Sequence, residues 1–271
     1  MTGKGIRLGR LFSNGENAVV IAVDHGEFDG PLPGMVNLPE AVKKIAPGVS
    51  AVLLSPGMLP HCGHAFNYKG APLAIVRLNW GTVYCFHWNY NEGKTVPALS
   101  AEDAVAVGAD LVLVSLTLNT GSEARDAANV EVFCALAAEA RRLGIPVVGE
   151  YFPANSDKLS PEQMHEQVFT GCRIIAELGA DLVKTFCTHR FKEVTESCPV
   201  PILGLGAEKT PTQLQALQLA ERIVQGGGRG VVFGRNAMQV SDPGAFQRAL
   251  CDVVKKGTPP AEAAQRHGLK D

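Results

Sequence analysis

Eight short apolar segments recur along the chain, and each is followed by a helix-like stretch or by a gap long enough for a helix. They span residues 18–23, 50–55, 73–78, 111–116, 146–151, 182–186, 201–205 and 230–234. Strands that alternate with helices form parallel sheets, and eight such units close on themselves. The pattern therefore predicts an α/β fold, a (β/α)8 TIM barrel. A doubly wound open sheet is the alternative, although no Gly-x-Gly-x-x-Gly follows the first segment to support dinucleotide binding.

The helix-like stretches complete the expected barrel. We expect helices over 38–46, from Ser100 onward, and over 122–143, 161–178, 189–197, 211–226, 243–255 and 259–267. The amphipathic segment 6–12 suits a short N-terminal helix that caps one end of the barrel, and helices form the C-terminus. At 271 residues the chain, 1–271, fits a single barrel domain of the ~250-residue kind. The aromatic-rich segment 80–91 either packs over a barrel end or forms a lid or subunit contact.

The composition excludes several classes of protein. The net charge is −2 and the basic residues are spread along the chain, so we expect no nucleic-acid binding. No apolar run is long enough to span a bilayer, and the N-terminus lacks a signal-peptide core, so we expect a cytoplasmic protein. Seven separated cysteines without a Cys-x-x-Cys pair predict reduced thiols. The cluster His61-Cys62-Gly63-His64 has no partner cluster, so we expect no metal site.

Lys184 stands near the end of the sixth segment, in the apolar sequence Leu-Val-Lys-Thr-Phe. A lysine is rarely buried without a partner, and desolvation lowers the pKa of such a lysine from about 10.4 toward about 7–8. The neutral amine then forms Schiff bases with carbonyl substrates. The structural alternative is a strand-end lysine that reaches water or pairs with a carboxylate.

Other polar residues are expected on the same rim, because barrels carry their chemistry at the C-terminal ends of several strands. Asp24 follows the first strand, and Glu150 and Tyr151 end the fifth. Together with Lys184 they supply a nucleophile and groups that move protons, which imine formation and C–C cleavage require. His25, beside Asp24, is either a base or a hydrogen-bonded packing group.

Two glycine-containing turns follow the seventh and eighth strands, Gly206-Ala207 and Gly234-Arg235. Barrels commonly bind phosphate there through backbone amides. Gly206 permits close approach of the backbone, and Arg235 adds a charge that can bind an anion in bidentate fashion. The alternative is that these glycines only make tight turns.

These residues resemble a known family, the archaeal-type (DhnA-type) class I fructose-bisphosphate aldolases, and with it the DeoC/LacD-like Schiff-base aldolases. The resemblance covers about residues 5–255. Its landmarks are Asp24-His25-Gly26 with Asp29-Gly30-Pro31, Asn119-Thr120-Gly121-Ser122-Glu123, Gly179-Ala180-Asp181-Leu182-Val183-Lys184-Thr185, and Gly234-Arg235-Asn236.

The resemblance implies roles for single residues. Lys184 matches the family's Schiff-base lysine, and Asp24 matches the acidic residue at the first strand. The phosphate-binding loops match Gly206, Gly234 and Arg235, with Ala207 in place of a second glycine. The resemblance also implies a ring-shaped homo-oligomer.

One position departs from the family, which usually has a Tyr immediately before Pro at the end of the fifth strand as its acid/base residue. Here Phe152 precedes Pro153, and Tyr151 comes one residue early. A shift of one residue reverses the face of a regular strand, so Tyr151 reaches the mouth only if the strand twists or bulges. Otherwise Glu150, which shares the face of Phe152, is the candidate proton shuttle.

The sequence thus predicts a class I, metal-independent aldolase-type lyase that acts on a phosphorylated keto or sugar substrate, resembling fructose-bisphosphate aldolase and needing no cofactor. A relative that uses the same lysine is an alternative, either an acyl-transferring thiolase of the autoinducer-2 breakdown type or a transaldolase-type synthase. A non-catalytic barrel that binds sugar phosphates is a further alternative.

Overall fold

The computed structural model describes residues 3–90 and 92–270 and confirms the barrel. Parallel strands close in the order β1-β10-β9-β8-β7-β6-β3-β2. Their bounds are Ala18–Ala22 (β1), Ala51–Leu54 (β2), Leu73–Arg77 (β3), Leu111–Leu116 (β6), Val147–Tyr151 (β7), Leu182–Phe186 (β8), Ile202–Leu205 (β9) and Gly230–Phe233 (β10). Each lies within a predicted segment. Because the sheet closes into a barrel, the alternative of an open sheet is wrong.

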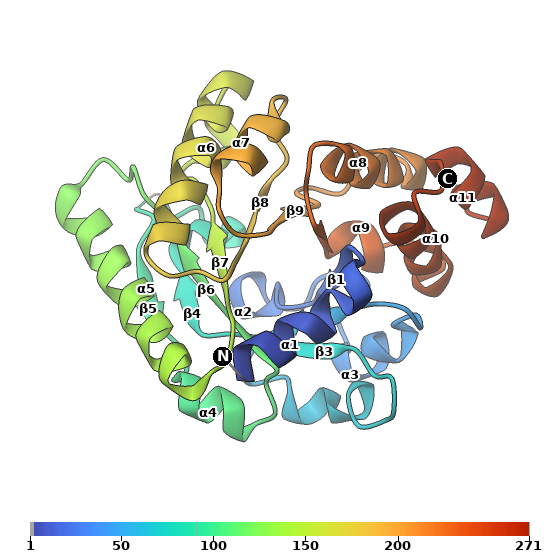
Figure 1. Ribbon diagram of the computed structural model, residues 1–271, viewed down its shortest axis with the longest axis horizontal. Coiled ribbons are helices and arrows are strands. Elements are labelled where there is room, and N and C mark those ends of the chain that lie inside the picture. Colours follow the sequence, from blue (N-terminus) through green and yellow to red (C-terminus); the bar gives the residue numbers. More distant parts are fainter. Residues whose placement is uncertain (1–2, 91, 271) are drawn as a thin grey trace.

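Helices surround the barrel as an outer layer (Figure 1). The longer ones are Glu123–Leu143 (α5), Pro161–Glu177 (α6), Phe191–Ser197 (α7), Gln213–Gln225 (α8), Pro243–Lys256 (α10) and Pro260–Arg266 (α11). The shorter ones are Gly26–Asp29 (α2), Leu38–Ala41 (α3), Ala101–Ala106 (α4) and Arg235–Met238 (α9). Local chemistry sets their starts. Reciprocal capping boxes begin α6 at Ser160 and α8 at Thr212, because each side chain accepts from a backbone amide of the first turn.

The helical layer is thin between β1 and β3. The helix expected over 38–46 is short, because α3 ends at Ala41 and continues as a 3-10 turn, Val42–Lys44. After β2 the chain forms the 3-10 helix Pro60–Ala65. Gly57 precedes this stretch and Gly63 lies within it, and glycine disfavours a continuous α-helix.

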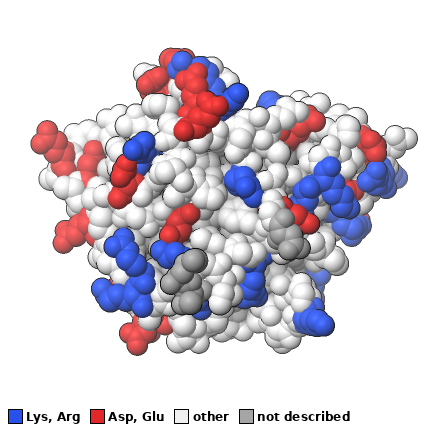
Figure 2. All heavy atoms as spheres, in the orientation of Figure 1, with Lys and Arg blue, Asp and Glu red and all other residues white. Residues whose placement is uncertain are grey.

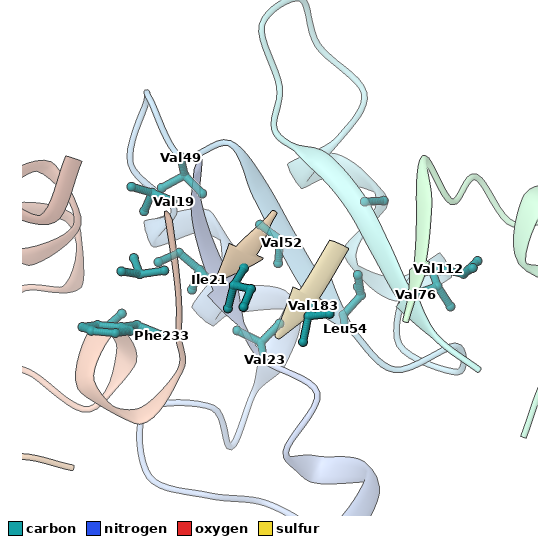
Figure 3. Close-up of a cluster of buried hydrophobic side chains, with 14 of the residues drawn as sticks. Val19, Ile21, Val23, Val49, Val52, Leu54, Val76, Val112, Val183 and Phe233 are labelled. Atoms are coloured by element: carbon teal, nitrogen blue, oxygen red, sulfur yellow. The ribbon is translucent and has the colours of Figure 1, made fainter. Parts of the chain in front are cut away.

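Alternate strand residues face two different cores. Val19 and Ile21 of β1 point outward and pack with the helices, and Figure 3 shows them beside Val52 and Leu54 of β2 in the same layer. Every second residue, such as Val20, points into the barrel and joins a separate interior cluster. The interior cluster thus fixes which side chain of each strand can face the mouth.

Helix α1 (Gly3–Leu11) closes the N-terminal end of the barrel, as predicted from its amphipathic pattern. Leu8, Leu11 and Phe12 pack against the interior cluster, and the helix lies across the middle of the ring of helices in Figure 1. On the face drawn in Figure 2 acidic and basic side chains are interspersed. The opposite end, where the strands end, is left for a pocket.

An antiparallel hairpin stands outside the barrel and was not predicted. Its strands are Asn79–Gly81 (β4) and Thr95–Pro97 (β5). Residues 82–90 of the aromatic segment lie between them, with Tyr84 buried and Phe86, Trp88 and Tyr90 exposed. The hairpin places Tyr84 at the pocket. It was not predicted because its strands have only three residues each, too few to show an alternation of apolar and polar residues in the sequence.

Candidate active site

A layer of charged side chains lies on top of the apolar interior of the barrel. Asp24, Arg77, Glu150 and Lys184 all continue the inward-facing series of their strands, and each is at most 7% exposed. The strand register places two of them side by side, because Glu150 of β7 is the direct partner of Lys184 in β8. The fold therefore places two cations and two carboxylates at the C-terminal ends of four strands.

The four side chains form a continuous chain of ion pairs. The Lys184 Nζ lies 2.5 Å from the Glu150 Oε1, and the Arg77 Nη2 donates to the Glu150 Oε2 at 2.5 Å. The Arg77 Nε donates to the Asp24 Oδ2 at 2.8 Å. Because the charges balance and are hydrogen-bonded, the burial cost of each ion is offset by its neighbours.

The network keeps both carboxylates ionised. Burial alone would raise the pKa of Asp24, but attraction by Arg77 and Lys184 prevails and lowers it from 3.8 to about 2. Burial likewise opposes ionisation of Glu150, and the same two cations lower its pKa. Lys184 thus pairs with a carboxylate, as the structural alternative expected. Because Lys184 also lines the pocket, the same contact places a proton acceptor beside the candidate nucleophile.

A pocket of about 950 Å³ opens above this layer. Asp24, Arg77, Glu150 and Lys184 line it at the level of the strands, and the loops after β9 and β10 form part of its wall. Its size suits a small metabolite. The structure thus brings the predicted nucleophile, the predicted acid and the predicted glycine turns to one cavity.

The two turns are built for close approach of the backbone. A Cβ at Gly234 would lie 2.2 Å from the His25 Cε1. Ala207 has a φ of 50°, in the left-handed region that favours glycine, so the turn keeps a glycine-like path in spite of its side chain. The Arg235 Nη2 donates to the Ala207 carbonyl at 2.9 Å, which ties the two turns together. Gly206 also lines the pocket at this end.

His25 lies between the charged layer and the glycine turns. It lines the pocket, and its Nδ1 is 3.8 Å from the Asp24 Oδ1, too far for a hydrogen bond. Burial lowers the pKa of His25, although Asp24 opposes the shift. A neutral imidazole on the wall of the pocket can donate or accept one hydrogen bond from a ligand.

Tyr151 does not line the pocket, so of the two alternatives left open by the sequence the structure has the regular strand end, with Glu150 facing the pocket. Five consecutive pairs join β6 to β7 up to Leu116 and Tyr151, without a bulge. Tyr151 therefore points outward, where its ring packs against Gly171 of α6. Phe152 faces the pocket in its place.

Two residues of the site were missed by reading the sequence. Arg77 ends β3 on the inward face and binds both carboxylates, and this parity with the apolar Leu73 and Ile75 is a signal that could have found it. Tyr84 lines the pocket from outside the barrel. Its position depends on the hairpin, so no strand pattern could have indicated it.

No metal site was expected from the sequence at His61-Cys62-Gly63-His64. Within 3–90 and 92–270 no group of three or more His, Cys, Asp or Glu side chains is arranged to hold a metal ion. The His64 Nε2 lies 3.0 Å from the Pro39 carbonyl oxygen, away from the pocket. All seven cysteines are free.

No helix in the described part of the chain has the length and apolar character needed to cross a membrane.

The chain is similar over nearly its whole length to an aldolase and a synthase of known sequence. An uncharacterized aldolase of Saccharolobus solfataricus is 32% identical over 97% of this chain and 98% of its own length. The 2-amino-3,7-dideoxy-D-threo-hept-6-ulosonate synthase of Halobacterium salinarum is 30% identical over 98% and 97%.

A solved structure adds the chemistry of a relative. It is an archaeal fructose-1,6-bisphosphate aldolase whose catalytic lysine is covalently bound to the carbinolamine intermediate of its substrate. The two structures share a TM-score of 0.79 and 28% sequence identity, over 92% of this chain and 98% of that one. Residues 18–240 match the family described as DeoC/LacD family aldolase. The chain therefore belongs to the DeoC/LacD family aldolases.

Proposed function

We propose that the protein is a class I, Schiff-base aldolase-type enzyme in which Lys184 attacks the carbonyl carbon of a phosphorylated keto substrate. The observation that carries this proposal is the Lys184–Glu150 pair at 2.5 Å, buried on the inner wall of the pocket. A buried lysine with a carboxylate at its amine has both the nucleophile and the acceptor for its proton. The relative trapped as a carbinolamine supports the same chemistry.

Imine formation can be followed atom by atom. Glu150 takes a proton from the Lys184 ammonium, and the neutral amine adds to the carbonyl carbon to give a carbinolamine. The carbinolamine hydroxyl leaves as water when Glu150 returns the proton. The resulting iminium carries a positive charge where the ammonium was, so the balance of charge with Asp24 and Glu150 is kept. This cation withdraws the electrons of the bond that breaks, and no metal ion or cofactor is needed.

The phosphate group would bind at the turns after β9 and β10. Gly206, Ala207 and Gly234 supply a backbone surface with little side-chain bulk, and Arg235 supplies charge. Lys209 also lines this part of the pocket. Within the described ranges Lys209 and Arg235 have no carboxylate partner at 4.0 Å or less, so both charges are available to an anion.

The charge distribution favours one phosphate group over two. Of the cations that line the pocket, Arg77 and Lys184 are bound to carboxylates. The turn after β9 carries one acidic side chain, Glu208, but it contributes a lysine as well. Among the described residues, the segments after β1 and β7 contribute Asp29 and Asp157 to the lining and no Lys or Arg. A second phosphate would be repelled there, so we propose a keto monophosphate as the preferred substrate, ahead of fructose 1,6-bisphosphate.

A synthase that transfers a carbon fragment to a second carbonyl compound is the second candidate. The Halobacterium salinarum synthase, at 30% identity over nearly the whole chain, favours it. The same lysine serves both outcomes, because the enamine left by cleavage can add to another acceptor. The retained ion-pair network argues against a barrel that only binds sugar phosphates, since binding alone does not require it.

A turnover assay tests the proposed function. Ketose mono- and bisphosphates are offered with EDTA present, and cleavage to an aldehyde is measured. We expect cleavage of at least one monophosphate, unaffected by EDTA, and its loss in the Lys184→Met variant. Turnover that survives this substitution, or that EDTA abolishes, would contradict the proposal.

A further inference from the structure

Tyr84 is held over the pocket by aromatic and cationic contacts. It ends the 3-10 helix Thr82–Tyr84 and is 7% exposed. Its ring lies 4.8 Å from the Phe28 ring and 4.7 Å from the Phe152 ring, between centroids. The Arg77 guanidinium carbon lies 4.8 Å from the Tyr84 centroid, a cation–π distance. The ring is therefore fixed directly above the ion-pair network.

The hydroxyl group of Tyr84 faces Glu150 and Ser115 but makes no well-formed hydrogen bond within the described part of the chain. A buried hydroxyl without a well-formed hydrogen bond is unfavourable in the folded protein. Tyr84 lines the pocket in which the substrate would lie, so a ligand bound there can complete this hydrogen bond. Phe152 touches the same ring and offers no proton.

We propose that Tyr84 is a catalytic residue that carries protons between the bound substrate and Glu150. This inference rests on the proposed Schiff-base chemistry at Lys184. It gives the pocket a second acid/base group, which neither Phe152 nor the outward-facing Tyr151 can supply.

The proton movement balances in the cleavage direction. The substrate hydroxyl next to the breaking C–C bond gives its proton to Tyr84 while Tyr84 passes its own proton to Glu150. The hydroxyl carbon becomes an aldehyde, and the electrons of the broken bond go to the iminium at Lys184, which becomes an enamine. In the reverse relay Glu150 returns the proton through Tyr84 to the enamine carbon. Tyr84 and Glu150 end as they began.

The electrostatics of the site agree with a relay in which Tyr84 stays neutral. Burial and the nearby Glu150 carboxylate raise the pKa of Tyr84 well above its ordinary value of 10.0. A phenolate is therefore not populated, whereas simultaneous gain and loss of a proton avoids it.

Deuterium exchange into dihydroxyacetone phosphate tests the role of Tyr84, because exchange needs both the imine and the proton carrier. We expect Tyr84→Phe to lower the exchange rate by roughly 10²- to 10⁴-fold, as for loss of a general acid/base group. Borohydride should still trap this ketone on Lys184 in Tyr84→Phe, because the variant keeps the ring and the lysine. Trapping also shows that the variant is folded.

Two further variants sharpen the test. Tyr68→Phe, at an exposed tyrosine before β3, should exchange like the wild type. The double variant Tyr84→Phe with Phe152→Tyr restores a phenol beside the lost one and should exchange at least ten times faster than Tyr84→Phe.

Three results would overturn the role of Tyr84. These are a Tyr84→Phe exchange rate within threefold of the wild type, a double variant no faster than Tyr84→Phe, and an equal loss in Tyr68→Phe. Wild-type protein that neither traps nor exchanges this ketone would instead contradict the proposed function itself, and the role of Tyr84 with it.

Discussion

Single residues decide whether the pocket can act on a carbonyl compound. Arg77 joins Asp24 to Glu150, and Glu150 joins Arg77 to Lys184, so each ion depends on the next. Ion pairs exposed to water contribute little to folding stability. Inside a barrel the loss of one partner is destabilising, because it leaves an uncompensated buried charge. The same contacts therefore carry both stability and the proposed chemistry.

Removal of the central carboxylate should affect both properties. Glu150→Gln keeps the shape of the side chain but leaves Lys184 without its counter-ion. We expect the free energy of unfolding to fall by about 3 kcal/mol, the lower bound for breaking a buried pair. We expect kcat to fall by about 10²-fold or more, because the proton acceptor is lost. Urea unfolding and steady-state kinetics measure the two effects, and a variant with wild-type stability would contradict the buried network.

Acid should weaken the fold through Asp24. Its pKa is about 2 in the folded protein, against about 3.9 in an unfolded chain, so it contributes stability above pH ~4 that is lost as the pH falls toward 2. The contribution is on the order of 2 kcal/mol. Asp24→Asn should therefore show a flatter dependence of unfolding free energy on pH between about 4 and 2. Parallel profiles for variant and wild type would exclude this role.

At the residue scale the sequence predicted part of the site. Lys184, Asp24, Glu150 and His25 were found because each stands at a strand end, and the structure brings them to one pocket. The roles assigned to them stay predictions. Tyr84 was missed because its position is set by contacts across the hairpin, which no local pattern records.

Secondary-structure elements set which face each residue presents. All the barrel strands were predicted, since buried parallel strands read as apolar runs. Regular pairing of β7 places Glu150 on the pocket side and Tyr151 on the outer side. A sequence cannot show whether a strand end bulges, so it could not tell which of the two faces the pocket. The hairpin and the 3-10 turns after β2 escaped prediction because they are too short for periodicity.

The contact between α6 and β7 gives a test at this scale. A Cβ at Gly171 would lie 2.1 Å from the Tyr151 Cζ, so Gly171→Ala must displace the ring or the helix. We expect a loss of about 2–3 kcal/mol of unfolding free energy. Gly9→Ala in α1 is the matched control, because its Cβ meets nothing within 4 Å. That change should stabilise by up to about 1 kcal/mol, and urea unfolding that shows equal effects would contradict the packing.

At the scale of the whole molecule, the barrel brings opposite ends of the chain to one pocket. The charge of the pocket lining is uneven. Among the described residues, Lys209 and Arg235 follow β9 and β10 together with Glu208, whereas Asp29 and Asp157 follow β1 and β7. Arg235→Met should therefore raise KM for dihydroxyacetone phosphate about tenfold, the cost of one anion contact of about 1.4 kcal/mol. KM for unphosphorylated dihydroxyacetone should not change. Equal changes in the two values would place the phosphate elsewhere.

The expected assembly into a ring-shaped homo-oligomer, and a cytoplasmic location, stay predictions. Phe86, Trp88 and Tyr90 are exposed in the segment between β4 and β5, and Phe86 also lines the pocket. Light scattering on the purified chain would establish the mass of the assembly, and a monomer would contradict this expectation.

Borohydride trapping is the most direct test of whether Lys184 forms an imine with a keto phosphate. Wild-type protein is incubated with dihydroxyacetone phosphate, reduced, digested and analysed by mass spectrometry. We expect a reduced adduct on the peptide that contains Lys184 and none in the Lys184→Met variant. An adduct on another lysine, or no adduct in the wild type, would contradict imine formation at Lys184.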